Sequence, residues 1–183
     1  MQNRAGFFAP SSEAGSYFIN LVREADVKIQ ISNPDRYNDA LHHTSPYFEN
    51  PIFIESHRLQ TYSKEAKNLS LVMNLMIHDI DIILNVVHSP VKNIYATGVG
   101  VVSKEPDVIN ARIEFDNGCI ANLTASKINP DNEHKINFYQ KDNFINVDYL
   151  NKTSTVHDLG RRMKSRKKDS LLNNIFSFDA QAK

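Results

Sequence analysis

The clearest structural signal in the chain is the stretch ARIEFDNGCIANLTAS, residues 111–126. Apolar and polar residues alternate on both sides of Asp116-Asn117-Gly118, and this period of two predicts two β-strands. The Asn-Gly pair supplies the positive φ angles of a tight hairpin turn, while the flanking aspartate allows a longer loop. The stretch therefore predicts an antiparallel hairpin with one apolar face and one mixed face. The apolar face holds Ala111, Ile113, Phe115, Cys119, Ala121, Leu123 and Ala125, and the mixed face holds Arg112, Glu114, Ile120, Asn122, Thr124 and Ser126.

Further segments with a period of two lie on both sides of this hairpin. Short turns join the later segments, and Lys141-Asp142-Asn143 suggests a second hairpin. Successive strands joined in this way are antiparallel, so the expected sheet is a meander. Its mixed face is expected to be solvated or to meet a second subunit. The predicted strands cover residues 27–31, 52–59, 92–102, 108–115, 119–127, 134–140, 144–149 and 153–158.

Three other segments have helical periodicity: residues 11–25, a short helix from about 33 to 41, and a long helix over 65–87. The polar residues of the long helix are spaced four, three, four and three apart, which puts them on one line along an otherwise apolar helix. They are Asn74, His78, Asp81, Asn85 and His88. The expected fold class is therefore α+β, a largely antiparallel meander sheet with a long helix packed on one face.

Charge is distributed unevenly along the 183 residues, although the formal net charge is zero. Residues 1–160 hold 14 basic and 19 acidic side chains, whereas residues 161–183 hold seven basic and two acidic ones. The acidic balance of the larger part argues against a nucleic-acid-binding protein. The basic run 161–168 is expected to lie in a solvated tail, and the alternative is a contact with phosphates or an acidic partner.

The chain is expected to be cytoplasmic and to have no membrane partner. Cys119 is the only cysteine, so an intrachain disulfide is impossible. The first residues lack the apolar stretch of a secretory signal. Charged residues interrupt the longest apolar tract, residues 69–87, and make it a poor membrane span.

The sequence contains one candidate for acid–base chemistry and few other catalytic motifs. The six glycines form neither Gly-x-Gly-x-x-Gly nor a Walker loop, so no cofactor is expected to bind through this chain. Cys119 follows a turn glycine in an apolar strand and is expected to be a small buried hydrophobe. His78 has Asn74 and Asp81 on its own helix face, and such neighbours can hold its ring in one tautomer. The alternatives are a core histidine or a metal ligand, but a metal site with Asp81 would lack a third ligand.

Three segments together resemble the Gfo/Idh/MocA oxidoreductases, the relatives of glucose–fructose oxidoreductase and inositol dehydrogenase. Leu75-Met76-Ile77-His78-Asp79-Ile80-Asp81 is similar to the family's histidine helix, residues 111–126 to its central hairpin, and residues 53–58 to its first sheet strand. The resemblance covers residues 7–150 and is closest to the branch that acts on nucleotide-linked sugars. It implies an N-terminal NAD(P)-binding domain and a C-terminal α+β domain that shapes the sugar pocket and carries the oligomer interface.

The resemblance also implies a division of the chain. Residues 1–32 correspond to the last helix and strand of a nucleotide-binding domain, and residues 33–160 to the substrate and oligomerisation domain. Residues 161–183 form a basic, flexible tail outside the family pattern. The implied partners are a second copy of the chain, bound through the exposed sheet face, and a sugar or sugar-nucleotide ligand.

Several residues that the family uses in catalysis are replaced in this chain. The family's Glu-Lys-Pro reads Phe8-Ala9-Pro10, its Gly-His reads Ser32-Asn33, and its Asp-x-x-x-His reads Asn74-x-x-x-His78. Alanine cannot donate a proton, and an amide cannot act as a carboxylate. His78 alone remains of the lysine–aspartate–histidine set, and hydride transfer also needs a bound nicotinamide. The substrate-binding residues that the resemblance implies are Arg36, Arg58 and Lys127.

Three functions are compatible with these features. The first is a catalytically inactive substrate-binding and dimerisation domain of oxidoreductase lineage, a pseudoenzyme, and this is the reading we adopt. The second is a fragment or subunit of an active sugar oxidoreductase whose cofactor domain is supplied elsewhere. The third is a non-catalytic module that binds a sugar nucleotide or a protein, for which two arginines could supply charge-assisted bonds to phosphate.

Overall fold

The computed structural model describes residues 12–28, 33–63, 70–160 and 175–179. The chain divides into two compact units, Met1–Asn33 and Pro34–Lys183. Within the described ranges, none of the helices is long and apolar enough to cross a membrane. The expected basic run 161–168 and Ala9 lie outside the described residues.

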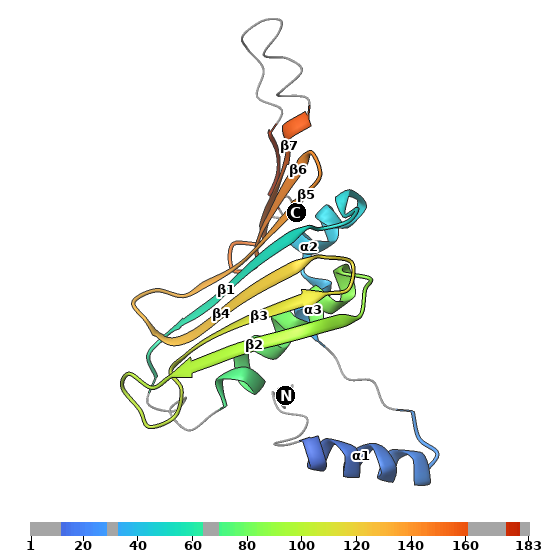
Figure 1. Ribbon diagram of the computed structural model, residues 1–183, viewed down its shortest axis with the longest axis vertical. Coiled ribbons are helices and arrows are strands. Elements are labelled where there is room, and N and C mark those ends of the chain that lie inside the picture. Colours follow the sequence, from blue (N-terminus) through green and yellow to red (C-terminus); the bar gives the residue numbers. More distant parts are fainter. Residues whose placement is uncertain (1–11, 29–32, 64–69, 161–174, 180–183) are drawn as a thin grey trace, which may run out of the picture. The chain divides into compact units, whose positions relative to one another are not determined.

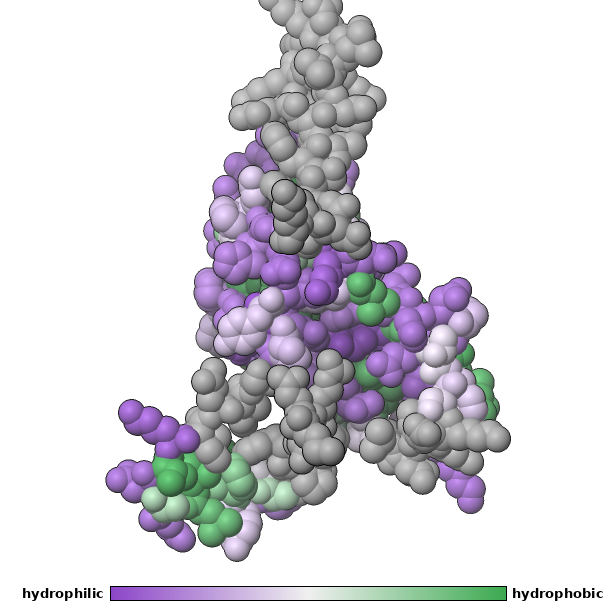
Figure 2. Space-filling view, turned by 180° about the vertical axis from the view of Figure 1, so that it is seen from behind, coloured by the Kyte–Doolittle hydropathy of each residue, from purple (hydrophilic) through white to green (hydrophobic). Residues whose placement is uncertain are grey.

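The smaller unit contains one amphipathic helix, α1 (Ser12–Glu24), as predicted. Its C-terminus closes with the 6→1 bond from Val27 N to Val22 O and the bond from Asp26 N to Arg23 O, with Asp26 at a φ of 51°. This is the Schellman geometry that ends many helices. Exposed apolar side chains gather on α1, as Figure 2 shows. The predicted strand 27–31 is not seen at its first two residues, and residues 29–31 lie outside the described ranges.

The larger unit is built on one eight-stranded sheet in the order β2-β3-β4-β1-β5-β6-β7-β8 (Figure 1). All neighbouring strands are antiparallel except β1 and β4, which are parallel. The strands are β1 (Phe53–Thr61), β2 (Val91–Val99), β3 (Val108–Phe115), β4 (Ile120–Asn129), β5 (Glu133–Gln140), β6 (Asn143–Asp148), β7 (Thr153–Asp158) and β8 (Ile175–Asp179). The expected α+β class with a largely antiparallel sheet is confirmed.

The order of the strands departs from a simple meander at one point. The chain runs from β4 directly into β5, yet these two strands do not pair, because β1 lies between them and bonds to both. A short connection enforces antiparallel direction but does not enforce pairing. The sheet also extends beyond the predicted strands, because β8 pairs with β7 in the segment that was expected to be tail.

The turns of the sheet follow the sequence signals. Gly118 has a φ of 85°, and the pair Phe115–Cys119 encloses a three-residue loop, as the aspartate before Asn-Gly allows. The β5–β6 turn has two residues between the pair Gln140–Asn143, and Asp142 adopts a φ of 63°. Both hairpins are therefore closed by residue types that tolerate the left-handed region.

Helical segments lie on one side of this sheet (Figure 1). A short helix was expected near 33–41, but the chain forms three short helical elements there. They are the 3-10 turn η1 (Pro34–Tyr37), the helix α2 (Asp39–Thr44) and a second 3-10 turn, η2 (Ser45–Tyr47). The side chain of Asn38 caps the N-terminus of α2. The long helix is composite, with a π-helical segment η4 (Val72–Met76) leading into α3 (Ile77–Val86). Residues 64–69 lie outside the described ranges.

The core lies between the sheet and these helices. All seven residues of the predicted apolar face are buried, and they meet Leu75, Met76, Ile82 and Ile83 of the helical layer. The opposite sheet face is partly exposed, although Ser126 on that face is buried. Cys119 is buried, and burial raises the pKa of its thiol to about 11, so the sulfur behaves as the expected inert apolar group.

Candidate functional site

The candidate site is a cluster of charged side chains between the sheet and α3. Side chains of a strand point alternately to its two faces, so Ile54, Ser56 and Arg58 of β1 all face the helices. Ile54 belongs to the apolar core, whereas Ser56 and Arg58 continue the row with polar groups. The strand alternation therefore places a guanidinium group inside the molecule, where it needs carboxylate partners.

Asp79 of α3 supplies the main partner. Its carboxylate is almost fully buried; Oδ1 accepts bonds from Nε and Nη2 of Arg58 at 3.0 and 2.7 Å, and Oδ2 accepts one from the Ser56 hydroxyl at 2.8 Å. Asp35 of η1 also binds Nη2 of Arg58, at 2.6 Å. Arg58 thus joins β1, α3 and η1 through two carboxylates.

His134 of β5 completes this ion cluster, which we define as Asp35, Arg58, Asp79 and His134. Its Nε2 lies 2.9 Å from Oδ1 of Asp79 and 2.7 Å from Nη2 of Arg58. The ring stacks on Tyr149 with centroids 4.1 Å apart and an interplanar angle of 17°. The buried Tyr149 hydroxyl has no hydrogen-bond partner among the described residues, and burial, followed by the charge of Asp79, raises its pKa well above the ordinary value.

The charges of the cluster stabilise one another. Burial raises the pKa of Asp79, but the contacts with His134 and Arg58 outweigh burial and hold that pKa below its ordinary value. Burial lowers the pKa of Arg58, and the two carboxylates outweigh burial in the opposite direction. The cluster therefore holds buried, paired charges, whose net contribution to stability is small but whose members are costly to remove singly.

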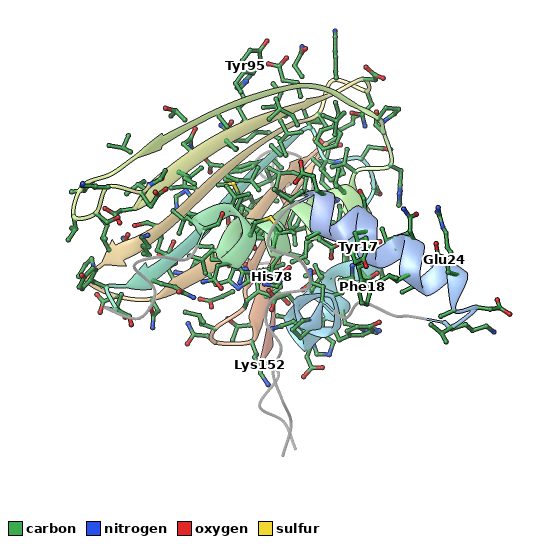
Figure 3. The ribbon with its side chains drawn as sticks, turned by 90° about the horizontal axis from the view of Figure 1, so that it is seen from below. Tyr17, Phe18, Glu24, His78, Tyr95 and Lys152 are labelled. Atoms are coloured by element: carbon green, nitrogen blue, oxygen red, sulfur yellow. The ribbon has the colours of Figure 1, made fainter. Side chains whose placement is uncertain are left out.

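His78 precedes Asp79 of this cluster on α3 and is half-buried. Figure 3 labels its position. Burial lowers the pKa of its ring, and the positive charge of Arg58 lowers it further. The imidazole is therefore neutral near pH 7 and able to accept a proton. Within the described part of the chain, no cluster of three or more potential metal ligands occurs.

Arg36 is the more accessible arginine of the two that the resemblance proposes as substrate residues. It lies on η1 and pairs through Nε and Nη2 with both carboxylate oxygens of Asp81 on α3. Its side chain is 46% exposed and that of Asp81 30% exposed, against 11% for Arg58. An exposed pair of this kind exchanges easily with solvent or a ligand, whereas the Arg58 bonds are buried.

Lys127 lies in a different polar cluster. Its ammonium group is buried and is 3.5 Å from Oδ1 of Asp107, the residue immediately before β3. Oδ2 of Asp107 accepts the backbone N–H groups of Val101, Val102 and Ser103, and Oδ1 accepts the Ser103 hydroxyl. The Ser103 bonds are the main reason that the pKa of Asp107 is far below its ordinary value. Lys127 therefore lies beside the loop that connects β2 to β3.

Two of the replaced family positions, Asn74 and Asn33, lie within the described residues. Asn74 belongs to η4, one of the rare π-helical segments that often occur at functional sites, and its backbone N–H binds Ser70 O. Asn33 is partly buried immediately before η1. Ala9 is outside the described residues.

The described residues do not fit a dinucleotide. A pyrophosphate needs a glycine-rich turn that leads from a strand into a helix, and the described glycines lie within α1, at the end of β2, in the β3–β4 turn and after β7. Three successive backbone N–H groups do form an anion cradle at residues 101–103, but Asp107 already fills it. We therefore assign no step of a reaction to NAD(P) on these residues.

The cluster contains three residues that the sequence interpretation did not select, Asp35, Asp79 and His134. The predicted polar line on the long helix runs beside the buried face, whereas Asp79 shares that buried face with Ile82 and Ile83. A carboxylate on the apolar side of a helix requires a cationic partner, and the inward position of Arg58 supplies it. This signal was available, but the position of His134 depends on the β1–β5 register, in which it pairs with Arg58.

Comparisons with known proteins agree with the resemblance in the sequence. The model of the GFO/IDH/MocA C-terminal domain matches residues 41–145. UDP-N-acetylglucosamine 3-dehydrogenase of Acidithiobacillus ferrooxidans is 26% identical over 154 residues, which are 84% of this chain and 49% of that protein. The chain thus spans about half the length of this curated relative.

Solved structures give the same result for the fold. A structure of the Acidithiobacillus ferrooxidans enzyme matches with a TM-score of 0.75 over 82% of this chain and 50% of that one, at 26% identity. An NAD-binding oxidoreductase from Klebsiella pneumoniae matches with a TM-score of 0.76 over 94% and 52%, at 12% identity, which supports the fold alone. The family model covers more than half of the chain, and we conclude that the chain belongs to the Gfo/Idh/MocA family through its C-terminal domain.

Proposed function

We propose that this chain is the substrate-binding and self-association domain of a sugar-nucleotide dehydrogenase lineage, and that it does not transfer hydride by itself. The observation that carries the proposal is the surface beside the ion cluster, where Arg36 and the neutral imidazole of His78 flank buried, paired charges. The relative that acts on UDP-N-acetylglucosamine supports the ligand class.

The ligand contacts follow from accessibility. Arg36 can exchange Asp81 for a phosphate oxygen because both partners are partly exposed, and a guanidinium matches phosphate with two parallel bonds. His78 can accept a hydrogen bond from a sugar hydroxyl in its neutral form. Arg58 acts behind them, because Asp79 and Asp35 already hold its guanidinium. Lys127 remains a predicted substrate residue whose ammonium group lies against Asp107.

The inactivity of this chain by itself is supported by its residues. Hydride transfer in the family implies a lysine and a carboxylate where this chain has Ala9 and Asn74. Neither residue can supply a charge or a proton at neutral pH. His78 retains an acid–base group without these partners.

Titration calorimetry of the chain with UDP-N-acetylglucosamine, UDP and NADH tests the proposal. We expect the two uridine nucleotides to bind and NADH to give no heat of binding. The Arg36→Ala variant should bind UDP at least about tenfold more weakly, since a lost charge-assisted bond costs about 1.5–3 kcal/mol. The matched control is Arg112→Ala on the opposite sheet face, where Arg112 pairs with Glu114 at exposures of 41% and 28%. Micromolar NADH binding, or equal effects of both variants, would contradict the proposal.

The span of the chain favours a second candidate, that this domain works within a complete sugar dehydrogenase. The chain corresponds to about half of its curated relative. Mixing it with a separately expressed nucleotide-binding domain of that relative, and following NAD reduction with UDP-N-acetylglucosamine, would test this. Activity that disappears in the His78→Ala variant would establish the second candidate over the first.

Self-association is proposed to use the open sheet face. Figure 3 shows Tyr95 on this side of the sheet and His78 on the other. Phe53, Tyr139, Phe144 and His157 stand side by side on four neighbouring strands of this face, with successive ring centroids 5.7, 5.0 and 5.6 Å apart. Tyrosine and phenylalanine are enriched in protein interfaces. Light scattering should show an oligomer that Tyr139→Glu converts to a monomer, while Tyr37→Glu on the helical side leaves it intact.

A further inference from the structure

The nitrogen Nη2 of Arg58 has more acceptors than hydrogens. It lies 2.7 Å from Asp79 Oδ1, 2.6 Å from Asp35 Oδ2 and 2.7 Å from His134 Nε2. A guanidinium Nη atom carries two hydrogens, so it can serve only two of the three neighbours with full bonds. The third position is the histidine ring, which is also the only neighbour able to change between donor and acceptor.

The nitrogen Nε2 of His134 faces both a hydrogen-bond acceptor and a hydrogen-bond donor. It lies 2.9 Å from Asp79 Oδ1, which accepts, and 2.7 Å from Arg58 Nη2, which donates. A ring nitrogen carries either a hydrogen or a lone pair. With a hydrogen, Nε2 donates to Asp79 and repels Arg58; without one, it accepts from Arg58 and its lone pair faces the Asp79 carboxylate.

We propose that His134 is a proton-operated switch that decides whether Arg58 holds the η1 turn through Asp35. When a proton from solvent binds Nε2, the ring donates to Asp79, and both hydrogens of Arg58 Nη2 serve Asp79 and Asp35. When the proton leaves from Nε2, so that the neutral ring keeps its hydrogen on Nδ1, the lone pair of Nε2 competes for one of these hydrogens. The bond to Asp35 weakens in preference, because Asp35 is 23% exposed and can replace it with water, whereas Asp79 is 2% exposed and cannot.

The surroundings of His134 contain the charges that such a switch needs. Arg58 faces it from β1, Asp79 and His78 from α3, Asp35 from η1, and the neutral Tyr149 ring covers its plane. Two carboxylates, one guanidinium and a second histidine thus surround the ring from three elements of the fold.

The switch reaches the surface through η1. Asp35 and Arg36 are consecutive residues of this turn, so loosening the Asp35 bond changes how firmly the neighbouring Arg36 is held against Asp81. This consequence is a property of the cluster, and it applies whether or not Arg36 binds a nucleotide.

Side-chain NMR of the full chain tests the switch without any ligand. Histidine ring nitrogens, the Arg58 Nε–H group and the backbone amides of Asp35 and Arg36 would be followed over about pH 5 to 8, the range in which histidines change charge. We expect the Arg58 and η1 signals to shift with the same midpoint as the His134 ring, and this common transition to be absent in His134→Gln. The His88→Gln variant, which changes an exposed histidine, should retain it.

Two results would overturn the switch. One is a His134 ring that keeps the same protonation state over this whole range in the unmodified chain. The other is a change in His134 protonation while the signals of Arg58 and η1 stay constant. Both are read from the unmodified protein, so they remain decisive if His134→Gln fails to fold.

Discussion

Two buried carboxylates of the larger unit, Asp79 and Asp107, solve the same physical problem in different ways. Asp107 binds three backbone N–H groups and a hydroxyl from residues no more than six positions away, and Lys127 adds a cation. Asp79 binds side chains from β1 and β5, far away in the sequence. The first carboxylate organises a loop, whereas the second ties separate elements of the fold together.

The two clusters also differ in whether their hydrogen bonding can change while the protein stays folded. Backbone amides have one protonation state, so the Asp107 cluster has one arrangement. The partners of Asp79 include a histidine and an over-committed guanidinium, so that cluster can change its bonding without unfolding. We expect a functional surface to lie next to the adaptable cluster rather than the fixed one, and His78 and Arg36 do lie there.

Removing Asp79 should have the largest effect. In Asp79→Ala, the buried Arg58 and His134 lose their main partner, and the free energy of unfolding should fall by about 3–5 kcal/mol. Urea denaturation followed by circular dichroism measures this. The isosteric Asp79→Asn variant should keep an acceptor for the Ser56 hydroxyl, so its free energy of unfolding should fall by less than that of Asp79→Ala. Equal stability of Asp79→Ala and the unmodified protein would contradict a tightly coupled cluster.

Removing Asp107 should have a local effect. Asp107→Ala leaves the N–H groups of residues 101–103 without their acceptor, while the sheet register between β2 and β3 persists through its own ladder. Hydrogen exchange at these three amides should accelerate at least about tenfold, with little change in β4 or β5. An equally large acceleration throughout the sheet would show that the two clusters do not differ as described.

Acidification should affect both clusters in the same direction. The pKa values of Asp79 and Asp107 are lowered in the folded protein, so the unfolded chain takes up protons first as the pH falls below about 4. The stability that these groups contribute is thus present above the ordinary carboxyl pKa and is lost as the pH falls through the lowered values. Asp107→Asn and Asp79→Asn should each reduce the proton uptake on unfolding by up to about one proton, as measured from urea midpoints at several pH values.

The smallest effect is expected at the exposed pair. Asp81→Ala removes the partner of Arg36, and because both side chains are partly in water the free energy of unfolding should change by no more than about 1 kcal/mol. The same denaturation experiment provides the comparison with Asp79→Ala, which lies two positions earlier on the same helix. A loss as large as that of Asp79→Ala would mean that exposure does not separate the two arginine pairs.

Much of the fold could be predicted from local patterns, because strand alternation and turn chemistry act over a few residues. The hairpin around Gly118, the apolar sheet face and helix α1 are such features. The position of β1 could not be predicted in this way, since the pairing of Phe53 with Ile120 and Tyr139 is set by long-range packing. The π-helical η4 was missed because a 3.6-residue period does not distinguish it from an α-helix.

The site was predictable to a smaller degree. His78 and Arg36 were selected from the sequence and lie on the helical side of the sheet, next to or near the ion cluster. Lys127 lies beside Asp107 in the other cluster, a pairing that depends on the β3–β4 register. His134 could not be selected, because its role depends on a histidine nitrogen shared by two partners from different elements.

The insertion of β1 between β4 and β5 has a consequence for how the protein assembles during synthesis. The two halves of the sheet, β2-β3-β4 and β5-β6-β7-β8, contact each other through β1, which leaves the ribosome before either half exists. Strand pairing over such sequence distances raises contact order and slows folding. Until β4 and β5 emerge, β1 has two unpaired edges, so this strand is the segment for which we expect a nascent-chain chaperone to matter most.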